Sequence, residues 1–414
     1  MSFNTLGLSP ALVHAVREQG YHAPTPIQNA AIPAILRGSD VLGLAQTGSG
    51  KTAAFALPLL QRITQTEKTL RQLRAIVLAP TRELAAQTGE VLRDFARMLP
   101  QRLKIAVAFG GVSINPQLMG LRGGCDVIVA TPGRLLDLIE HNALRLDGVE
   151  LLVLDEADRL LDLGFSDELN RILALMPLKR QNLFFSATFA PAVQKLADSL
   201  LHEPERIEIV PEQVRADAIQ QRAIHVDESN RTPLLRHLLV TEGWQRLLVF
   251  VASKYAAEHV SDKLWANGIK AAALHGELSQ GTRTKVLAAL KSGEVQVLVA
   301  TDVAARGLDI PELPAVLNYD LPRAAADYTH RIGRTGRAGE TGVAVSFIPA
   351  DAEAHFRLIE KRQGHRVPRE QIAGFEAKEV ASEAQATGGV KGKRPSKKDK
   401  LRAAAAAAAE TASN

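Results

Sequence analysis

Short apolar runs alternate with longer amphipathic stretches along the first half of the chain. Stretches such as 81–97 and 132–141 place apolar residues at helical spacing, whereas the short runs between such stretches are apolar at every position. Strands that are apolar on both faces and separated by helices predict a parallel sheet covered on both sides. The predicted strands are 41–45, 75–79, 104–108, 127–130, 151–154 and 183–185.

The same alternation returns in the second half. It breaks at 210–221, VPEQVRADAIQQ, and resumes with predicted strands at 247–251, 271–274, 295–300, 315–318 and 343–348 and helices such as 255–266. We therefore predict two α/β domains, 1–212 and 222–375, joined by a linker at 213–221. Periodicity fades beyond residue 375, and the Gly/Lys/Ser-rich and Ala-rich segment 376–414 is expected to be a disordered tail.

The positive charge of the chain is concentrated in this tail. The chain has 50 basic and 45 acidic residues; seven of the former and two of the latter lie beyond residue 390, so residues 1–390 carry 43 of each. A cationic tail favours a polyanionic partner, most simply nucleic acid, although it can also serve only as a solvated, solubilising segment. Its charged residues are Lys391, Lys393, Arg394, Lys397, Lys398, Asp399, Lys400, Arg402 and Glu410.

Several protein classes are disfavoured. The single cysteine, Cys125, excludes an intrachain disulfide and indicates a reducing compartment, and its apolar surroundings favour a small buried residue over a nucleophile. The first residues lack a signal-peptide pattern, and no apolar run approaches the roughly 18 residues of a membrane span. The 11 histidines show no metal-ligand spacing. We expect a soluble, cytoplasmic protein.

A phosphate-binding loop is predicted directly after the first strand. The run Ala45-Gln46-Thr47-Gly48-Ser49-Gly50-Lys51-Thr52 ends in the GK[ST] pattern and precedes a predicted helix. Backbone N–H groups of such a loop and the helix N-terminus hold phosphates, Lys51 would neutralise them and Thr52 would bind Mg²⁺. The general pattern starts with Gly rather than Ala45, and a glycine-rich turn without a ligand is the alternative.

A second acidic motif and an arginine motif complete the predicted ATPase site. The segment 151–158, LLVLDEAD, ends a strand in carboxylates: Asp155 would bind Mg²⁺ through water, and Glu156 would orient and deprotonate the attacking water. The alternative is a helix N-cap. In 330–337, HRIGRTGR, arginines of the second domain could reach across as fingers, or belong to a structural turn. Fingers would require domain closure, with ATP as the switch.

These motifs, in this order, closely resemble the DEAD-box RNA helicase family over roughly residues 3–360, and Asp155-Glu156-Ala157-Asp158 spells its name. The resemblance implies two tandem RecA-like domains and an ATP-dependent RNA helicase that uses ATP and Mg²⁺. Ala45 is the expected first residue of the loop in this family. The compact form with a basic tail looks most like the bacterial RhlE-like subgroup.

The resemblance also implies roles for residues that their own pattern leaves open. Gln28 would hydrogen-bond the adenine, with Phe3 and Tyr21 beside the base, although the run GYHAPTPIQ at 20–28 otherwise suggests a Pro-rich turn before a helix. Asp309 would contact the ribose, and Arg334 and Arg337 would be the fingers. Coupling between hydrolysis and unwinding would involve Asp158, Ser186, Thr188, Asp302 and His330.

RNA contacts are implied in both domains, mainly to the sugar–phosphate backbone. Aromatics make up only 4% of the chain and no basic run is interleaved with them, so a base-stacking groove is not indicated. Backbone contacts predict weak sequence preference and salt-sensitive affinity, and closure on one strand would bend it and open short duplexes locally. The implied residues are Pro80, Thr81, Arg82, Gly110, Gly111, Thr131, Arg134, Ser253, Gln280, Arg283 and Thr301.

Two other functions fit the same motifs. One is a DNA helicase of the same superfamily, because pattern alone does not reveal recognition of the 2′-hydroxyl. The other is an ATP-gated RNA clamp that holds partners rather than separating strands. We expect a monomer that acts in ribosome assembly or RNA turnover, with ribosomal precursor particles or RNA-decay proteins as candidate partners.

Overall fold

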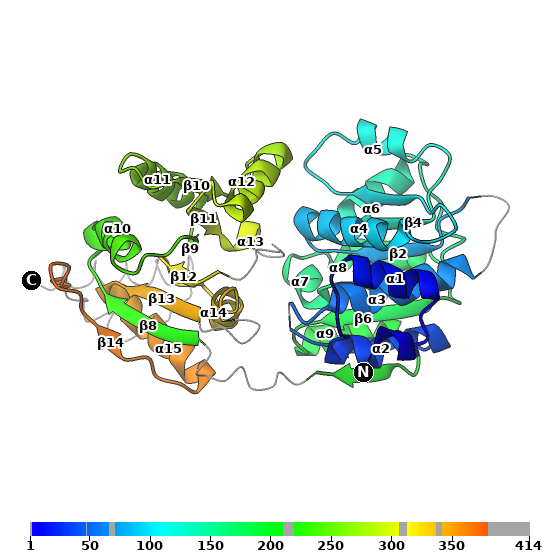
Figure 1. The fold of residues 1–414 in the computed structure, drawn as a ribbon, viewed down its shortest axis with the longest axis horizontal. Helices are drawn as coiled ribbons and strands as arrows, with labels where there is room; N and C mark the ends of the chain where they lie inside the picture. Colours follow the sequence, from blue (N-terminus) through cyan, green and yellow to red (C-terminus); the bar gives the residue numbers. More distant parts are fainter. Residues whose placement is uncertain are drawn as a thin grey trace, which may run out of the picture. The chain divides into compact units, whose positions relative to one another are not determined.

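The computed structural model describes residues 2–46, 48–65, 71–209, 219–305, 313–336 and 342–379. These residues form two compact units, one up to residue 209 and the other from residue 219. Each unit contains one seven-stranded sheet, sheet A in unit 1 and sheet B in unit 2, and the strand pairs described are parallel. Figure 1 shows each sheet with helices packed against it. The predicted pair of parallel α/β domains is confirmed.

Sheet A has the strand order β3-β4-β2-β5-β6-β1-β7. Five of its strands are buried at every position, which explains why they are apolar on both faces. Because all strands are parallel, the residues that follow them meet at one edge, the carboxyl edge. The strands are β1 (Val41–Leu44), β2 (Ala75–Leu78), β3 (Ile105–Ala108), β4 (Val127–Ala130), β5 (Leu151–Leu154), β6 (Gln181–Ser186) and β7 (Glu205–Glu208).

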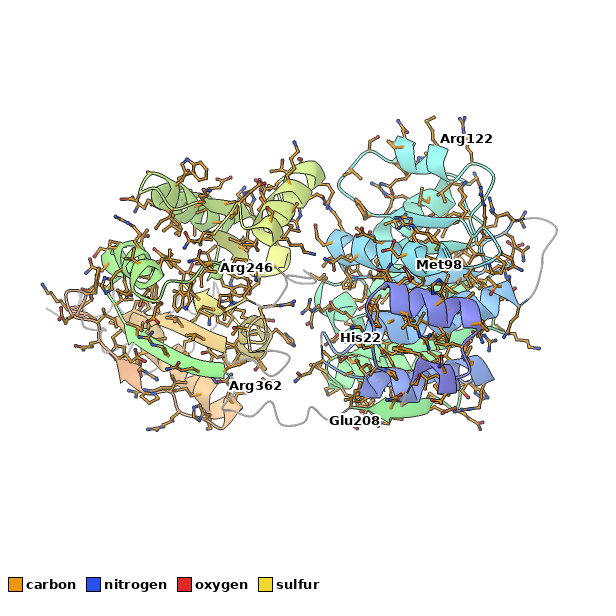
Figure 2. The ribbon with its side chains drawn as sticks, in the orientation of Figure 1. His22, Met98, Arg122, Glu208, Arg246 and Arg362 are labelled. Carbon is orange, nitrogen blue, oxygen red and sulfur yellow. The ribbon has the colours of Figure 1, made fainter. Side chains whose placement is uncertain are left out.

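Two hydrophobic cores lie on the two faces of sheet A. One is built with helices α1 to α4 and the other with helices α6 to α9. Alternate strand residues serve the two faces: Val41 packs in the first core and Leu42 in the second. The helices are η1 (Phe3–Thr5), α1 (Pro10–Glu18), α2 (Pro26–Arg37), α3 (Lys51–Thr64), α4 (Arg82–Ala96), α5 (Asn115–Gly120), α6 (Pro132–Glu140), α7 (Ala157–Asp162), α8 (Ser166–Ala174) and α9 (Pro191–Leu200). Arg122, just after α5, points outward (Figure 2).

Sheet B has the corresponding order β10-β11-β9-β12-β13-β8-β14. Helices α10 and α11 pack on one face of sheet B. From β10 onward the chain crosses the sheet in the opposite direction, toward β14, so helices α12 to α15 cover the other face. The elements are β8 (Ile219–His225), η3 (Glu228–Asn230), α10 (Arg231–Thr241), β9 (Leu247–Val251), α11 (Lys254–Trp265), β10 (Ala271–Leu274), α12 (Gln280–Ser292), β11 (Val297–Thr301), α13 (Asp302–Ala305), β12 (Ala315–Asn318), α14 (Ala325–Ile332), β13 (Gly342–Ile348), η4 (Ala350–Ala352), α15 (Glu353–Gln363) and β14 (Arg369–Glu370).

The three strands that sequence periodicity missed are polar. Strand β7 alternates half-buried and exposed residues at one edge of sheet A, and β8 contains two glutamines and an arginine. Strand β8 begins at Ile219, so the last three residues of the predicted linker 213–221 belong to sheet B. Its polar side chains are tolerated because partners meet them: Arg222 binds both Glu370 and Glu242, at 2.7 Å each.

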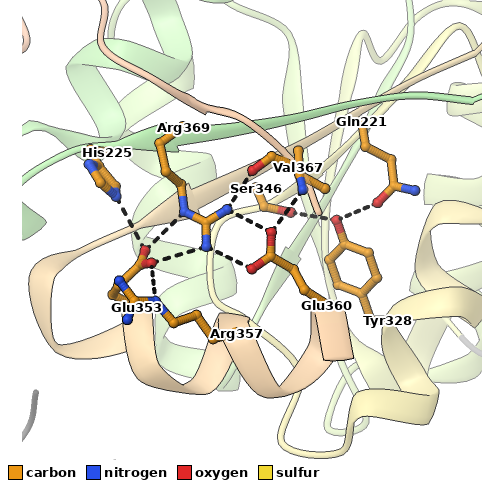
Figure 3. A network of polar contacts seen from close by, with 9 residues as sticks. All are labelled: Gln221, His225, Tyr328, Ser346, Glu353, Arg357, Glu360, Val367 and Arg369. Carbon is orange, nitrogen blue, oxygen red and sulfur yellow. Dashed lines mark hydrogen bonds and ion pairs between the residues drawn. The ribbon is translucent and has the colours of Figure 1, made fainter. Parts of the chain in front are cut away.

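The segment 365–379, termed the C-terminal strap, adds β14 beside β8. The Arg369 guanidinium donates to both carboxylates of α15, Glu353 at 3.0 Å and Glu360 at 2.8 Å, and lies 4.7 Å from the centre of the Phe356 ring. Figure 3 shows this cluster, with His225 of β8 also reaching Glu353 at 3.2 Å. The strap is therefore joined to α15 and β8 by charged hydrogen bonds.

The strap continues past the predicted end of the second domain at residue 375. The Phe375 ring lies 5.3 Å from that of His237, and the Asp227 carboxylate accepts the backbone N–H groups of Lys378 and Glu379 at 2.9 and 3.0 Å. Residues 376–379, assigned to the tail from fading periodicity, are thus bonded to unit 2, because hydrogen bonds to one aspartate hold them rather than apolar packing. The rest of the predicted tail lies outside the described residues.

Three expectations from the sequence concern Cys125, metal sites and membrane-spanning helices. Cys125 is fully buried, and burial raises the pKa of its thiol to about 12, which confirms a packed rather than nucleophilic residue. Within the described ranges, no group of three or more His, Cys, Asp or Glu side chains is arranged to hold a metal ion by itself. None of the described helices combines the length and apolar character that crossing a membrane requires.

Candidate nucleotide and nucleic-acid sites

The predicted phosphate loop follows β1 at the carboxyl edge of sheet A. Gly48 and Gly50 adopt left-handed backbone conformations, with φ of 84° and 91°, which side chains other than glycine rarely adopt. Gly50 is also the N-cap of α3, so the loop delivers the chain directly to a helix N-terminus. Gln46 and Gly48 are exposed, and the Gln46 carbonyl accepts the Ser49 hydroxyl at 2.7 Å. Thr47 lies outside the described residues.

The Lys51 ammonium is buried at this loop. It is 6% exposed and donates to the Ala45 carbonyl at 2.7 Å, while the Ala45 N–H donates to the backbone carbonyl of Ser186. Burial lowers the pKa of Lys51, and the carboxylates of Asp155, Glu156 and Asp158 oppose that effect. One cation thus faces three acids, while Thr52, the next residue, is half-buried.

Gln28 connects the predicted adenine element to the phosphate loop. Its side chain is completely buried; Nε2 donates to the Gly50 carbonyl at 3.1 Å, and Oε1 accepts the N–H of Thr25 at 3.0 Å. A Cβ atom at Gly50 would lie 2.5 Å from Gln28 Nε2, so the close approach requires glycine. The amide that is predicted to read adenine is therefore bonded to the backbone that is predicted to hold phosphates.

The two predicted aromatic partners of adenine pack into the unit. Phe3 is 4% exposed within the core formed with α1 to α4. Tyr21 is half-buried, and its ring centre lies 6.0 Å from that of Phe95. Their contact with a base stays a prediction.

The acidic motif lies at the end of β5, beside the phosphate loop. Asp155 is 2% exposed, and burial, followed by the neighbouring Glu156, raises its pKa to about 7. Glu156 has φ of 50° and ψ of 54°, a left-handed conformation that is strained for a residue with a side chain. Its carboxylate pairs with Arg159 at 3.0 Å. Two adjacent carboxylates thus lie near enough to Lys51 to favour its charged form.

The predicted coupling residues of unit 1 form one hydrogen-bonded group. Thr188 Oγ1 donates to Asp158 Oδ2 at 3.1 Å, and the Ser186 hydroxyl donates to the Thr188 carbonyl at 2.8 Å. Asp158 Oδ1 is buried without a hydrogen-bond partner in the described part of the chain. The group thereby ties the segment after β6 to helix α7, which follows the carboxylates that are predicted to be catalytic.

The RNA-contact residues predicted in unit 1 come together at the carboxyl edge of β2, β3 and β4. A Cβ at Gly111, whose φ is 76°, would lie 1.8 Å from Arg82 Nη2, so the guanidinium of Arg82 covers the Gly111 backbone. Gly110 donates its N–H to Thr131 at 3.4 Å, and Arg134 Nη2 donates to the Val112 carbonyl at 2.8 Å. The run Pro80-Thr81-Arg82 follows β2, and Thr81 caps α4.

Arg134 is the buried cation of this cluster. It is 7% exposed and pairs with Asp137 at 3.2 Å, while its Nη1 atom is buried with no hydrogen-bond partner among the described residues. A buried, unsatisfied guanidinium donor costs free energy unless an acceptor reaches it. A phosphate oxygen would be such an acceptor.

In unit 2, the corresponding residues follow strands of sheet B. Ser253 follows β9 and accepts the Ala256 N–H at 3.1 Å as the N-cap of α11, and Thr301 ends β11. Gln280 opens α12, and its Oε1 atom is buried without a partner among the described residues. Arg283 is 4% exposed and donates to the His275 carbonyl at 2.9 Å, so it supports the loop before α12.

Arg331 is a site residue that sequence reasoning missed. Its guanidinium donates to both oxygens of Asp302, at 2.6 and 2.7 Å, and to Asn318 Oδ1 at 3.0 Å and the Asp320 carbonyl at 2.6 Å. It is 3% exposed and lies over the ring of Phe250. Its place in HRIGRTGR was the available signal, but the pattern did not distinguish the inward arginine from the predicted fingers.

The remaining residues of that motif differ in exposure. Arg334 is 7% exposed, and His330 is half-buried with Nδ1 4.0 Å from Asp327. The predicted Arg337 and Asp309 lie outside the described residues. The finger, ribose and domain-linking roles of these four residues stay predictions.

Comparison with known proteins gives two family matches. The model described as DEAD/DEAH box helicase matches residues 25–196, and that described as helicase conserved C-terminal domain matches residues 230–339. Among solved structures, Saccharomyces cerevisiae Dbp5 bound to RNA and ADP BeF3 is similar, with a TM-score of 0.78 and 33% identity, over 90% of this chain and 95% of that chain. The fold predicted from the resemblance, two tandem RecA-like domains, is confirmed.

Curated bacterial relatives give the same result. The ATP-dependent RNA helicase DeaD of Mycobacterium tuberculosis is 44% identical over 361 residues, which are 87% of this chain and 63% of that protein. The DEAD-box ATP-dependent RNA helicase CshA of Bacillus cereus is 40% identical over 368 residues, 89% of this chain and 69% of that protein. This chain thus spans less than two thirds of the DeaD protein. Placement in the RhlE-like subgroup stays a prediction. By both family matches and these relatives, the chain belongs to the DEAD-box helicase family.

Proposed function

We propose that this protein is an ATP-dependent RNA helicase, an RNA-stimulated ATPase that opens short duplexes locally. The observation that carries the proposal is the buried group at the carboxyl edge of sheet A. There Lys51 faces Asp155 and Glu156, next to a loop with two left-handed glycines. The names of the relatives, ATP-dependent RNA helicases, support the same activity.

The residues present fit Mg²⁺ at this group. Asp155 is a buried carboxylate whose pKa is raised by burial, and a nearby cation would stabilise its charged form. A carboxylate and a hydroxyl are oxygen donors of the kind that Mg²⁺ accepts, so Asp155 and Thr52 would hold it. When bound, Mg²⁺ neutralises charge on the phosphate oxygens.

Each of the other roles in ATP hydrolysis falls to a residue of the chain. Lys51 neutralises phosphate charge, and the N–H groups at the start of α3 donate to phosphate oxygens. Glu156, held by its strained turn, accepts a proton from the attacking water. Gln28 reads adenine, with Phe3 and Tyr21 beside it, and Asp309 contacts the ribose. Arg334 and Arg337 stabilise charge on the transferring phosphoryl group when the two units close.

RNA binding uses the carboxyl edges of both sheets. In unit 1 the joined group of Arg82, Gly111, Thr131 and Arg134 offers backbone donors and a guanidinium to phosphates. In unit 2, Ser253, Gln280 and Thr301 occupy the corresponding edge. Such contacts grip the backbone and carry little sequence information, so many RNAs would be substrates.

We further propose a cytoplasmic monomer that acts on ribosomal precursor particles or in RNA turnover. An ATP-gated RNA clamp would use the same residues, as would a DNA helicase of this superfamily. Unwinding assays separate the helicase from the clamp, and a DNA substrate separates RNA from DNA specificity.

The first test is steady-state ATP hydrolysis by the wild type and by Glu156→Gln, with no nucleic acid, with single-stranded RNA, and with DNA of the same sequence. We expect RNA but not DNA to stimulate the wild type, and the variant to lose at least about 100-fold in turnover, because general-base catalysis typically contributes 10²–10⁴-fold. The variant should still bind ATP and RNA. Equal stimulation by DNA would contradict the RNA assignment, and an active variant would contradict the role of Glu156.

A further inference from the structure

Tyr255 is an exposed aromatic side chain in a protein with few of them. Its side chain is 70% exposed, and within the described part of the chain only Trp265, at 63%, is a comparably exposed aromatic. The Tyr255 ring stacks on the imidazole of His259, one helical turn further along, with ring centres 5.5 Å apart and planes inclined by 12°. The ring therefore presents one flat face while its other face is supported.

The ring lies at the edge of sheet B where RNA contacts are proposed. Tyr255 is in the first turn of α11, two residues after Ser253, which caps that helix. Side chains on a helix lean toward its N-terminus, so the Tyr255 ring leans toward the carboxyl edge of the sheet. Trp265 lies at the other end of α11, about 15 Å away along the helix at 1.5 Å per residue.

The loop after β10 lies directly beside this first turn. The Lys254 ammonium pairs with Glu277, and His275 Nε2 lies 3.2 Å from Glu258 Oε1. These contacts join α11 to the loop that leads into Gln280, the other proposed RNA contact of this region. Tyr255 therefore belongs to a helix turn that begins next to Ser253 and is joined by its neighbours to the loop before Gln280, and both residues are proposed to hold the RNA backbone.

The chemistry of this surface favours a base rather than a phosphate. Lys254 and His275 already pair with carboxylates, whereas the exposed group in the first turn of α11 is the aromatic ring of Tyr255. Aromatic side chains bind nucleobases by stacking, which tolerates any sequence because every base has a π-face. A ring that is already held by a stacked neighbour loses little conformational freedom when it binds.

We propose that Tyr255, supported by His259, is a stacking platform for one nucleobase of the bound strand. The proposal rests on the proposed RNA-binding function and deepens it, because it adds a base contact to a grip on the backbone. The sequence contains no basic run interleaved with aromatic residues, and a platform made of one aromatic ring does not require such a run.

The test measures binding of a single-stranded RNA oligonucleotide by the full chain, using fluorescence anisotropy with a non-hydrolysable ATP analogue. Tyr255→Ala should weaken binding about 5-fold or more, the loss typical of one stacked base. Tyr255→Phe should bind like the wild type, because the ring remains. Trp265→Ala, on the same helix but away from the edge, is the matched control and should bind normally.

Salt dependence and abasic RNA identify the contact. The slope of log affinity against log salt should be the same for Tyr255→Ala and the wild type, since no phosphate contact is lost. An abasic site at one RNA position should weaken the wild type by the factor that Tyr255→Ala causes, and should not weaken that variant further. This non-additivity would place the base on the ring.

The proposal fails if Tyr255→Ala binds RNA within 2-fold of the wild type, or if its loss adds fully to that of every abasic position. A wild type that binds no RNA would overturn the proposed function as well. A wild type that binds RNA together with an unaffected Tyr255→Ala would overturn only the platform. Thermal melting of both proteins verifies folding, which an exposed side chain should not affect.

Discussion

Around Arg331, one guanidinium connects residues that follow two strands of sheet B with helix α14. Asp302 follows β11 and Thr301, a proposed RNA contact, while Asp320 follows β12. The Asp320 carboxylate accepts the Ala252 N–H at 2.8 Å, next to Ser253. A bidentate fork of this kind sets both distance and orientation, which a lysine ammonium does not. Arg331 therefore positions the segments after β11 and β12, where RNA contacts are proposed, relative to α14, the helix that leads to Arg334.

Arg331→Ala should loosen this edge of unit 2. The substitution leaves Asp302 without its partner, and loss of one member of a buried ion pair lowers the free energy of unfolding by about 3–5 kcal/mol. We expect a loss of about 2–4 kcal/mol here, because the Asp302 side chain is 26% exposed. Hydrogen exchange by mass spectrometry should show faster exchange in α13 and α14, with α1 to α4 unchanged.

Arg331→Lys is the matched control for charge. It keeps the cation but not the fork, so its exchange should fall between those of the wild type and Arg331→Ala. If α13 and α14 exchange as slowly in Arg331→Ala as in the wild type, packing alone holds this edge of the sheet.

At the scale of elements, the C-terminal strap completes sheet B. Strand β14 is two residues long, too short to hold by ladder hydrogen bonds alone. Each of its residues is held by a charged cluster: Arg369 by Glu353 and Glu360, and Glu370 by Arg222. The strap covers β8, which would otherwise be an edge strand with unpaired backbone groups.

This arrangement predicts a specific pH dependence. Burial alone would raise the pKa of Glu353, but hydrogen bonds from Arg369, Arg357 and His225 outweigh it and lower the pKa from 4.5 to about 2. Because the folded pKa is below the unfolded one, the stabilisation is present above pH 4.5 and is lost as pH falls toward 2. It amounts to about 3 kcal/mol at most.

The urea concentration at which unit 2 unfolds, measured from pH 6 down to pH 2.5, tests this dependence. Glu353→Gln should be less stable than the wild type near pH 6, and the difference should shrink toward pH 2.5. A constant difference across that range would show that the carboxylate's charge contributes nothing to the strap. Glu294→Gln, a change to an exposed carboxylate of the same unit, serves as the control.

At the scale of the whole molecule, the net positive charge lies in a different part of the chain from the proposed sites. The formal charge of +5 comes from residues beyond 390, whereas residues 1–390 are formally neutral. The proposed site residues all lie within residues 3–337. The tail therefore adds long-range attraction for a polyanion to a body whose contacts are local.

Deleting residues 391–414 should weaken RNA binding in a salt-dependent way and leave hydrolysis at saturating RNA unchanged. Each lost phosphate contact reduces the slope of log affinity against log salt by about 0.7 for a single strand, so we expect a slope shallower by about 2 or more. Titrations between 50 and 300 mM salt measure this. An unchanged slope would leave the tail a solubilising segment.

The sequence by itself predicted most of the regular structure. Strands 127–130, 151–154, 247–251, 271–274 and 315–318 have the predicted bounds in the structure, because buried parallel strands must be apolar at every position. The phosphate loop and the acidic motif were also predictable. Their chemistry requires particular residue types at fixed spacing next to a strand, and that requirement is written locally in the chain.

Tertiary structure alone decided the polar strands and the partners of the charged groups. Strands β7, β8 and β14 lack an apolar pattern, and their stability depends on residues far along the chain, such as the pairing of Arg222 with Glu370. The same holds for Gln28 against Gly50, Arg331 against Asp302, and the exposed face of Tyr255. Local sequence encodes periodicity and motif spacing, but which distant group meets a given side chain depends on how the strands are ordered in the sheet.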